Sequence, residues 1–176
     1  MRPGPSDAPS QRRGYTLVEV LVVVSVLGIA AAMVIPSMSS ASVLRVQGAI
    51  RTLVADVAIA QSDAIAYQKS RAIVFFDDST GPRYVVCEVN GPTLDLNVDR
   101  INEQRLGGEQ FGFANFENIN LPNNMLVIDE LGGPVMAPAD PTPAPAGSID
   151  IVDSDQRFRV NIEAYTGRVT VSSHPR

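Results

Sequence analysis

Residues 14–35 of the chain read GYTLVEVLVVVSVLGIAAAMVI, and this stretch decides the fold. A single acidic residue, Glu19, interrupts an otherwise uncharged and mostly apolar run, which is followed by Pro36. The 21 residues 15–35 match the ~20 residues that an α-helix needs to cross the hydrocarbon core of a bilayer. The sequence therefore predicts a transmembrane helix at residues 15–35.

The residues before this run, 1–14, are polar and are expected to form a disordered leader. They read MRPGPSDAPSQRRG, in which three arginines against one aspartate give a charge of +2. Arg12 and Arg13 stand directly before the apolar run, and the next basic residue is Arg45. By the positive-inside rule, this asymmetry keeps the N-terminus in the cytoplasm and sends the C-terminal bulk across the membrane.

Glu19 is out of place in this helix, because an ionised carboxylate inside a bilayer needs a cationic partner or access to water. One interpretation is that Glu19 lies near the membrane interface, where its side chain reaches water. The other is that the chain is cut between Gly14 and Tyr15. The new α-amino group would then lie one helical turn from Glu19 and neutralise it, within one chain or between neighbouring chains.

The order of glycine, aromatic residue, Thr-Leu-Val, glutamate and long apolar run resembles the class III leader of type IV prepilins and type II secretion pseudopilins. In that family a prepilin peptidase cleaves after the glycine and N-methylates the new first residue, which is usually Phe. The resemblance implies cleavage after Gly14 and methylation of Tyr15, and it implies that Glu19 pairs with the terminal amine of an adjacent subunit. Pro36 matches a proline that the family commonly carries after the apolar run, and a bend of the helix is expected there.

The resemblance also implies a location and partners. The protein would be a single-pass subunit of the bacterial inner membrane, with a cytoplasmic N-terminus and an extracytoplasmic domain. It would later assemble into a type II secretion pseudopilus or a type IV pilus-like filament and support protein secretion. Its partners would be the prepilin peptidase, other pilin or pseudopilin subunits and an inner-membrane assembly platform.

Two other interpretations of the N-terminal run stay open. The run also resembles a cleaved secretory signal peptide with residues 30–32 as its small-residue site, although it is longer than such an apolar region usually is. A plain single-pass anchor is the second alternative.

Residues 36–69 continue in a helical pattern. Apolar residues recur at near-helical spacing while charged residues fall on another face, which predicts an amphipathic helix whose apolar stripe packs on a sheet. The predicted stripe consists of Val43, Val46, Ile50, Leu53, Val54, Val57, Ala64 and Ile65. Together with the apolar run, this segment predicts one helix of about 80 Å over residues 15–69.

Residues 70–176 are expected to form a β-rich globular domain. Apolar and alternating runs between turn-rich segments predict strands at residues 72–76, 83–89, 125–128, 148–152, 157–165 and 169–171. Residues 90–124 are predicted to be a long loop with at most one short strand, and the proline-rich residues 132–147 an exposed polyproline-like loop. The layout predicts an α+β, pilin-like fold with a long N-terminal helix packed on an antiparallel β-sheet. It resembles the GspH/FimT branch of minor pseudopilins and pilins.

The chemical inventory argues against an enzyme. The chain of 176 residues has one histidine, His174, and one cysteine, Cys87, and it carries no phosphate-binding, nucleophile-elbow or zinc-protease motif. Cys87 is expected to be a small buried hydrophobic residue of a strand. No catalytic residue and no cofactor are therefore expected.

Calcium is the one metal that the sequence suggests, because the family's major pseudopilins bind calcium in a loop of the globular domain. Asp150, Asp153 and Asp155 are candidate ligands, although the same residues also suit a tight turn.

The alternative function is a membrane-anchored minor pilin whose β domain binds a ligand such as DNA. The formal charge of −5 argues against nucleic-acid binding. DNA binding would therefore need a local basic patch. The candidate patches are Arg83, Arg100 and Arg105, or Arg157, Arg159 and Arg168.

Overall fold

The computed structural model describes residues 15–153 and 156–175, without the side chains of residues 33–42, Glu109, His174 and Pro175. The chain divides into two units, Met1–Ser39 and Ser40–Arg176. The helix α1 (Leu17–Tyr67) contributes residues to both units. The predicted α+β class, with an N-terminal helix and an antiparallel β-sheet domain, is confirmed.

The helix α1 has 51 residues, starting two residues after the predicted start and ending two residues before the predicted end. It ends where Gln68 takes a left-handed conformation, with φ of 52°. The N–H of Lys69 then donates to the carbonyl of Ala64 at 3.3 Å, which is the hydrogen bond of a Schellman motif. The Gln68 side chain donates to the carbonyls of Ile65 and Glu130. This end of the helix is therefore tied to a loop of the β-rich unit.

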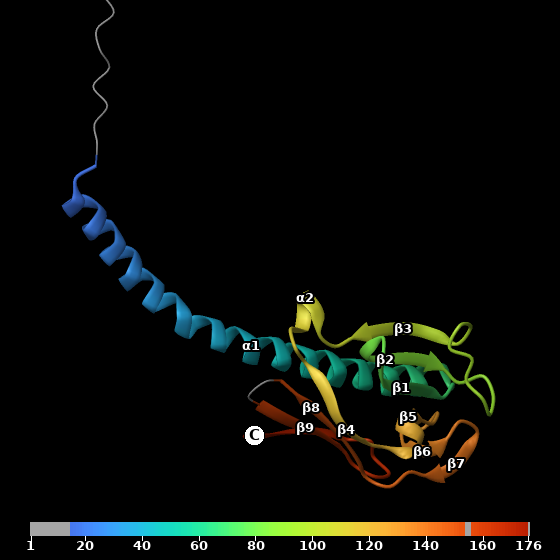
Figure 1. Cartoon of the computed structure of the whole chain (residues 1–176). Coiled ribbons are helices and arrows are strands. Elements are labelled where there is room, and N and C mark those ends of the chain that lie inside the picture. Colours follow the sequence, from blue (N-terminus) through green and yellow to red (C-terminus); the bar gives the residue numbers. More distant parts are fainter. Residues whose placement is uncertain (1–14, 154–155, 176) are drawn as a thin grey trace, which may run out of the picture. The chain divides into compact units, whose positions relative to one another are not determined.

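The β-rich unit contains two antiparallel sheets (Figure 1). The first sheet has the strand order β3-β2-β1-β5-β6-β7. Its strands are β1 (Arg71–Asp78), β2 (Gly81–Glu88), β3 (Arg100–Arg105), β5 (Met125–Ile128), β6 (Pro134–Ala137) and β7 (Asp140–Pro143).

The second sheet has the order β10-β9-β8-β4. Its strands are β4 (Asn115–Asn120), β8 (Gly147–Val152), β9 (Gln156–Ile162) and β10 (Val169–Pro175). A short helix α2 (Gly108–Phe111) precedes β4, and a 3-10 turn η1 (Pro122–Asn124) follows it.

One core is shared by α1 and both sheets. The helix contributes Val46, Ala49, Ile50, Leu53, Val57, Ala60 and Ala64. The first sheet contributes Ile73, Phe75, Tyr84, Val86, Leu126 and Ile128, and the second contributes Phe116, Ile149, Ile151, Phe158, Val160 and Ile162. Within this core, the rings of Phe75 and Phe116 meet edge to face, with centroids 5.7 Å apart.

The predicted apolar stripe of α1 is largely confirmed, with one error. Val46, Ile50, Leu53, Val57 and Ala64 are buried, and Val43 and Val54 are partly buried. Ile65 is 51% exposed, because the stripe passes through Ala64 and leaves the next residue at its margin.

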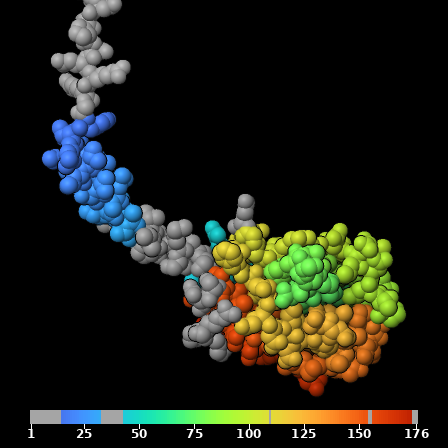
Figure 2. Space-filling view, in the orientation of Figure 1, coloured from blue at the N-terminus to red at the C-terminus, as the bar shows by residue number. Residues whose placement is uncertain are grey.

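The prediction of a polyproline-like loop at residues 132–147 is wrong, because β6 and β7 form a hairpin there. Pro134 begins β6 and pairs with Ile128, and Pro143 ends β7 opposite Val135. Proline lacks an N–H donor, and it is tolerated as the first residue of a strand, as in β6, and in an edge strand such as β7. In Figure 2 this hairpin, in orange, lies on the surface of the β-rich unit.

Residues 90–124 also contain more regular structure than predicted, namely β3, α2, β4 and η1. Both strands lie at the outer edge of a sheet, and few of their residues are buried. β4 also carries a register shift between Phe116 and Asn118. The alternation of apolar and polar residues that marks a half-buried strand is therefore missing from this part of the sequence.

Candidate functional site

The candidate site begins where α1 begins. Tyr15 and Thr16 lie outside the helix, and Tyr15 is 83% exposed. The Thr16 hydroxyl accepts a hydrogen bond from the N–H of Glu19 at 3.2 Å. The Thr16 carbonyl accepts one from the N–H of Val20, also at 3.2 Å. Tyr15 and Glu19, which the sequence singled out, are thus held within one turn of each other.

Several predicted site residues lie outside the described part of the chain. These are Gly14 at the expected cleavage point, Arg12 and Arg13 before it, the rest of the leader, and Asp155. Position 36 is helical, but the side chain of Pro36 is not described, so the bend expected there stays a prediction. The last residues of the expected membrane span, 33–35, likewise have no described side chains.

The first half of α1, where its side chains are described (residues 17–32), exposes apolar side chains on every face. From Leu17 to Ile29, the large apolar residues are between 52% and 82% exposed, and Glu19 is the only charged residue in this range. The Ser25 hydroxyl donates to the Leu21 carbonyl at 2.8 Å, so that its polar atom is satisfied within the helix. This surface is suited to apolar surroundings and not to water.

Where side chains are described, the structure contains no helix that is both long enough and apolar enough to cross a membrane.

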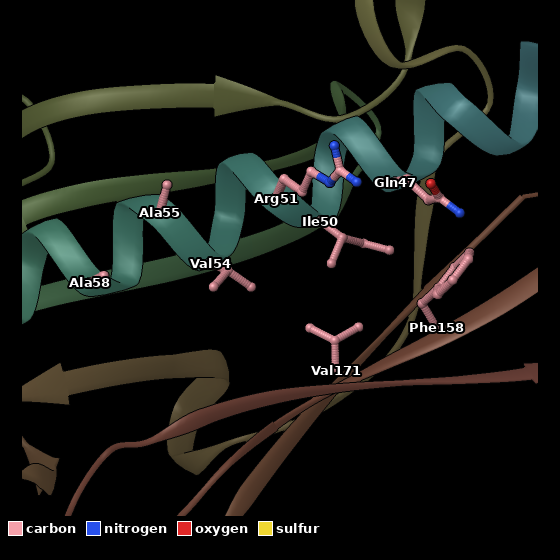
Figure 3. A pocket seen from close by; sticks show the side chains of 8 residues that line it. All are labelled: Gln47, Ile50, Arg51, Val54, Ala55, Ala58, Phe158 and Val171. Atoms are coloured by element: carbon pink, nitrogen blue, oxygen red, sulfur yellow. The ribbon is translucent and has the colours of Figure 1, made fainter.

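The second half of α1 borders an apolar groove in the β-rich unit (Figure 3). The groove has a volume of about 570 Å³ and is lined by Gln47, Ile50, Arg51, Val54, Ala55 and Ala58 of α1, and by Phe158 and Val171 of the second sheet. Ile50 and Val54 point from the helix toward Phe158 and Val171 on the strands. Val171 lies on the edge strand β10 and is 46% exposed. The groove therefore offers an apolar surface for packing.

The first candidate basic group does come together on the first sheet. Arg83, Arg100 and Arg105 all lie within 4.0 Å of Glu103, at 4.0, 3.0 and 3.3 Å. Arg83 also pairs with Asp78 at 2.8 Å. The Arg83 guanidinium, followed by the Thr80 hydroxyl, lowers the pKa of Asp78 well below its ordinary value. The three cations are thus partly neutralised by two carboxylates.

The second candidate basic group does not gather around one point. Arg157 pairs with Glu117, Arg159 with Asp150, and Arg168 with Glu163. Each of these cations has its own carboxylate.

The structure gives the candidate calcium ligands other contacts. Both oxygens of Asp150 accept hydrogen bonds from Arg159, at 2.7 and 2.8 Å. Asp153 is 6% exposed, and its N–H donates to the carbonyl of Gln156. Within the described residues, the structure brings together no group of three or more side chains that could hold a metal ion.

Cys87 is fully buried in β2, as expected. Burial, with a smaller contribution from the Asp99 charge, raises its pKa to about 11. The thiol therefore stays protonated near neutral pH, which makes it a poor nucleophile.

Comparison with known proteins identifies the N-terminal segment. The family model of the prokaryotic N-terminal methylation motif matches residues 9–35, which include Gly14, Tyr15 and Glu19. Comparisons with curated proteins and with solved structures found no match. Residues 9–35 are therefore a prepilin-type N-terminal methylation motif, the class III leader of type IV prepilins and pseudopilins that the sequence predicted.

Proposed function

We propose that this protein is a pilin or pseudopilin subunit that a prepilin peptidase processes and that then assembles with other subunits into a filament. The observation that carries the proposal is the direct continuation of the methylation motif into α1. The first half of this helix exposes an apolar surface, and its second half supplies a stripe of the β-domain core. One element thus offers both an assembly surface and an anchor for the domain that it would carry.

The finer parts of the proposal follow from the family resemblance. The filament is a type II secretion pseudopilus or a type IV pilus-like fibre that supports protein secretion, and the subunit is a minor one of the GspH/FimT kind. Before assembly, the subunit is anchored in the inner membrane with its leader in the cytoplasm, where it meets the assembly platform. Glu19 pairs with the terminal amine of a neighbouring subunit, because a carboxylate among apolar helices needs a cation.

We further propose that the chain has no catalytic activity and needs no cofactor. The protonated, buried Cys87 and the engagement of Asp150 by Arg159 support this proposal. The chemistry is instead done on this protein by its peptidase.

Intact-mass measurement of the membrane-extracted protein tests the processing. We expect a chain that begins at Tyr15 and carries one added methyl group. A Gly14→Leu variant is the control and should keep its leader. A wild-type mass that begins at Met1 would contradict processing, and one that begins after Ala32 would identify a secretory signal peptide instead.

Binding of DNA is the second candidate function, and the gathering of Arg83, Arg100 and Arg105 on one sheet supports it. If it is correct, a filter-binding titration should show affinity that falls as salt rises. Arg100→Gln with Arg105→Gln should then weaken binding, whereas Arg168→Gln, which removes a separately paired cation, should not. Absence of salt-dependent binding by the wild-type chain would remove this candidate.

A further inference from the structure

The start of α1 is defined by one hydroxyl group. The first amides of a helix have no acceptor within the helix itself. Here the Thr16 hydroxyl accepts from the N–H of Glu19, and Leu17 is the first helical residue. Thr16 is thus the N-cap, and Glu19 occupies the third helical position, which gives the Thr-x-x-Glu pattern of a capping box.

We propose that Thr16 is a positioning residue for leader cleavage, an inference that rests on the proposed processing by a prepilin peptidase. By fixing the first helical residue at Leu17, the cap keeps Tyr15 outside the helix. Exposed, non-helical segments are the sites that peptidases cut most readily. Tyr15 is 83% exposed and lies outside the helix. The peptidase therefore need not unwind a helical turn to reach the peptide bond between Gly14 and Tyr15.

The loss of the cap would change where the helix starts. The amide of Glu19 would lose its acceptor, and in apolar surroundings no water replaces it. The chain recovers an acceptor for that amide when the carbonyl of Tyr15 enters the helical hydrogen-bond pattern, four residues before Glu19. The helix would then grow by a residue toward the leader and take up the peptide unit beside the scissile bond.

The chemical step itself is hydrolysis. Water adds to the carbonyl carbon of Gly14, the bond to the nitrogen of Tyr15 breaks, and the products are a Gly14 carboxylate and a Tyr15 amine. The peptidase supplies the groups that move protons in this step. Thr16 acts only through the conformation in which it presents the bond.

The experiment uses the full-length chain in proteoliposomes with a prepilin peptidase, and it measures the initial rate of leader release by intact mass. Thr16→Val removes the hydroxyl but keeps the shape of the side chain. It should slow cleavage roughly fivefold, the effect of losing one typical cap. Thr16→Ser and Thr16→Asn, which restore a capping oxygen, should be cleaved at the wild-type rate.

Ser25→Ala is the matched control, because Ser25 also carries a hydroxyl bonded within α1, but to the Leu21 carbonyl away from the helix start. It should be cleaved like wild type. Amide hydrogen exchange of the full-length chain in detergent gives a second readout. The Glu19 amide should be protected by the capping oxygen in wild type and in Thr16→Ser, and by the Tyr15 carbonyl in Thr16→Val once the helix has grown.

Three outcomes would overturn the inference. The first is cleavage of Thr16→Val at the wild-type rate. The second is equal slowing by Thr16→Val and Ser25→Ala, which would show a general loss of helix. The third is slow cleavage of Thr16→Val without rescue by Thr16→Ser, or with a Glu19 amide that exchanges rapidly, because the helix would then not have grown toward the leader. A wild-type chain that the peptidase leaves uncut would instead overturn the proposed function, and this inference with it.

Discussion

Tyr84 shows how a single polar atom is accommodated in the core. Its side chain is fully buried, yet its hydroxyl donates to the Oδ2 atom of Asp56 at 2.6 Å. Burial, followed by the hydrogen bond and the charge of Asp56, raises the pKa of Tyr84 well above its ordinary value. The hydroxyl therefore stays a donor at physiological pH and links α1 to the first sheet.

Tyr84→Phe should lower the free energy of unfolding by about 1–2 kcal/mol, because partly buried Asp56 loses its donor. Urea unfolding of the full-length chain in detergent, followed by circular dichroism, measures this loss. Tyr165→Phe is the control, since Tyr165 is 76% exposed. Equal losses in the two variants would show that the link to Asp56 adds nothing.

The two members of the ion pair between Asp150 and Arg159 differ in burial. Replacing one should therefore lower the free energy of unfolding more than replacing the other. The Asp150 side chain is 4% exposed and that of Arg159 is 41% exposed. Arg159→Met should lower the free energy of unfolding by about 2–3 kcal/mol at neutral pH, because the buried carboxylate of Asp150 loses a charged partner. Asp150→Asn should cost less, because Arg159 reaches water. The same urea titration compares the two variants. A larger loss of stability in Asp150→Asn than in Arg159→Met would contradict the argument from burial.

Most strands at inner sheet positions could be read from the sequence, and most edge strands could not; the edge strand β10, predicted at residues 169–171, is an exception. β5 occupies the predicted residues 125–128, and in β9 Phe158, Val160 and Ile162 are buried in strict alternation, as predicted. Such strands are buried on at least one face, so their apolar residues recur with period two. β3, β6 and β7 lie near the sheet margins and carry few buried residues or several prolines, which hides them from pattern analysis.

Two features of the structure differ in how clearly the sequence indicates them. The cap at Thr16 is readable from the sequence, since Thr-x-x-Glu before an apolar run is a recognised signal for the start of a helix. The burial of Arg71 was not readable. This residue begins β1 and is 4% exposed, because its guanidinium donates to the carbonyls of Lys69 and Ser70 and pairs with Glu88. Those contacts depend on the turn that joins helix and sheet.

The loop between β2 and β3 depends on one carboxylate. Asp99 accepts hydrogen bonds from the Asn90 side chain and from the N–H of Asp95. These bonds, the one from Asn90 first, lower the pKa of Asp99. A carboxyl whose pKa is lower in the folded state stabilises the fold above its unfolded pKa of about 4. That stabilisation is lost as pH falls through the lower, folded pKa.

Acidification should therefore loosen this loop before the sheets open. The protection of the Asp95 amide against hydrogen exchange should fall as pH drops below about 4. The Val89 amide is the control, because its acceptor is the backbone carbonyl of Ser70, which does not titrate. In Asp99→Asn, protection at Asp95 should be low already at neutral pH and no longer depend on pH. A wild-type loop that keeps its protection in acid would contradict this account.

At the scale of the whole molecule, α1 serves two different environments. In its first half none of the described side chains, those of residues 17–32, is buried in a core, whereas seven residues of its second half are part of the shared core. Within the described residues, the Glu19 carboxylate has no ion-pair partner. In the proposed filament, that partner is the amine of another subunit.

Glu19→Ala should therefore reduce incorporation into filaments at least tenfold, since an unpaired amine would then be buried among apolar helices. Pull-down of assembled fibres from cells that express both wild-type and variant chains measures the ratio. Asp77→Ala, which removes an exposed carboxylate in the β-rich unit, is the control and should incorporate normally. Normal incorporation of Glu19→Ala would rule out the pairing.

The burial of Cys87 has a practical consequence for such experiments. The chain has one thiol, and it is both inaccessible and protonated at neutral pH. A maleimide dye or a spin label added to the native fold should therefore leave it untouched. Any cysteine introduced at the surface becomes the sole reactive handle, so single-site labelling needs no cysteine-free background.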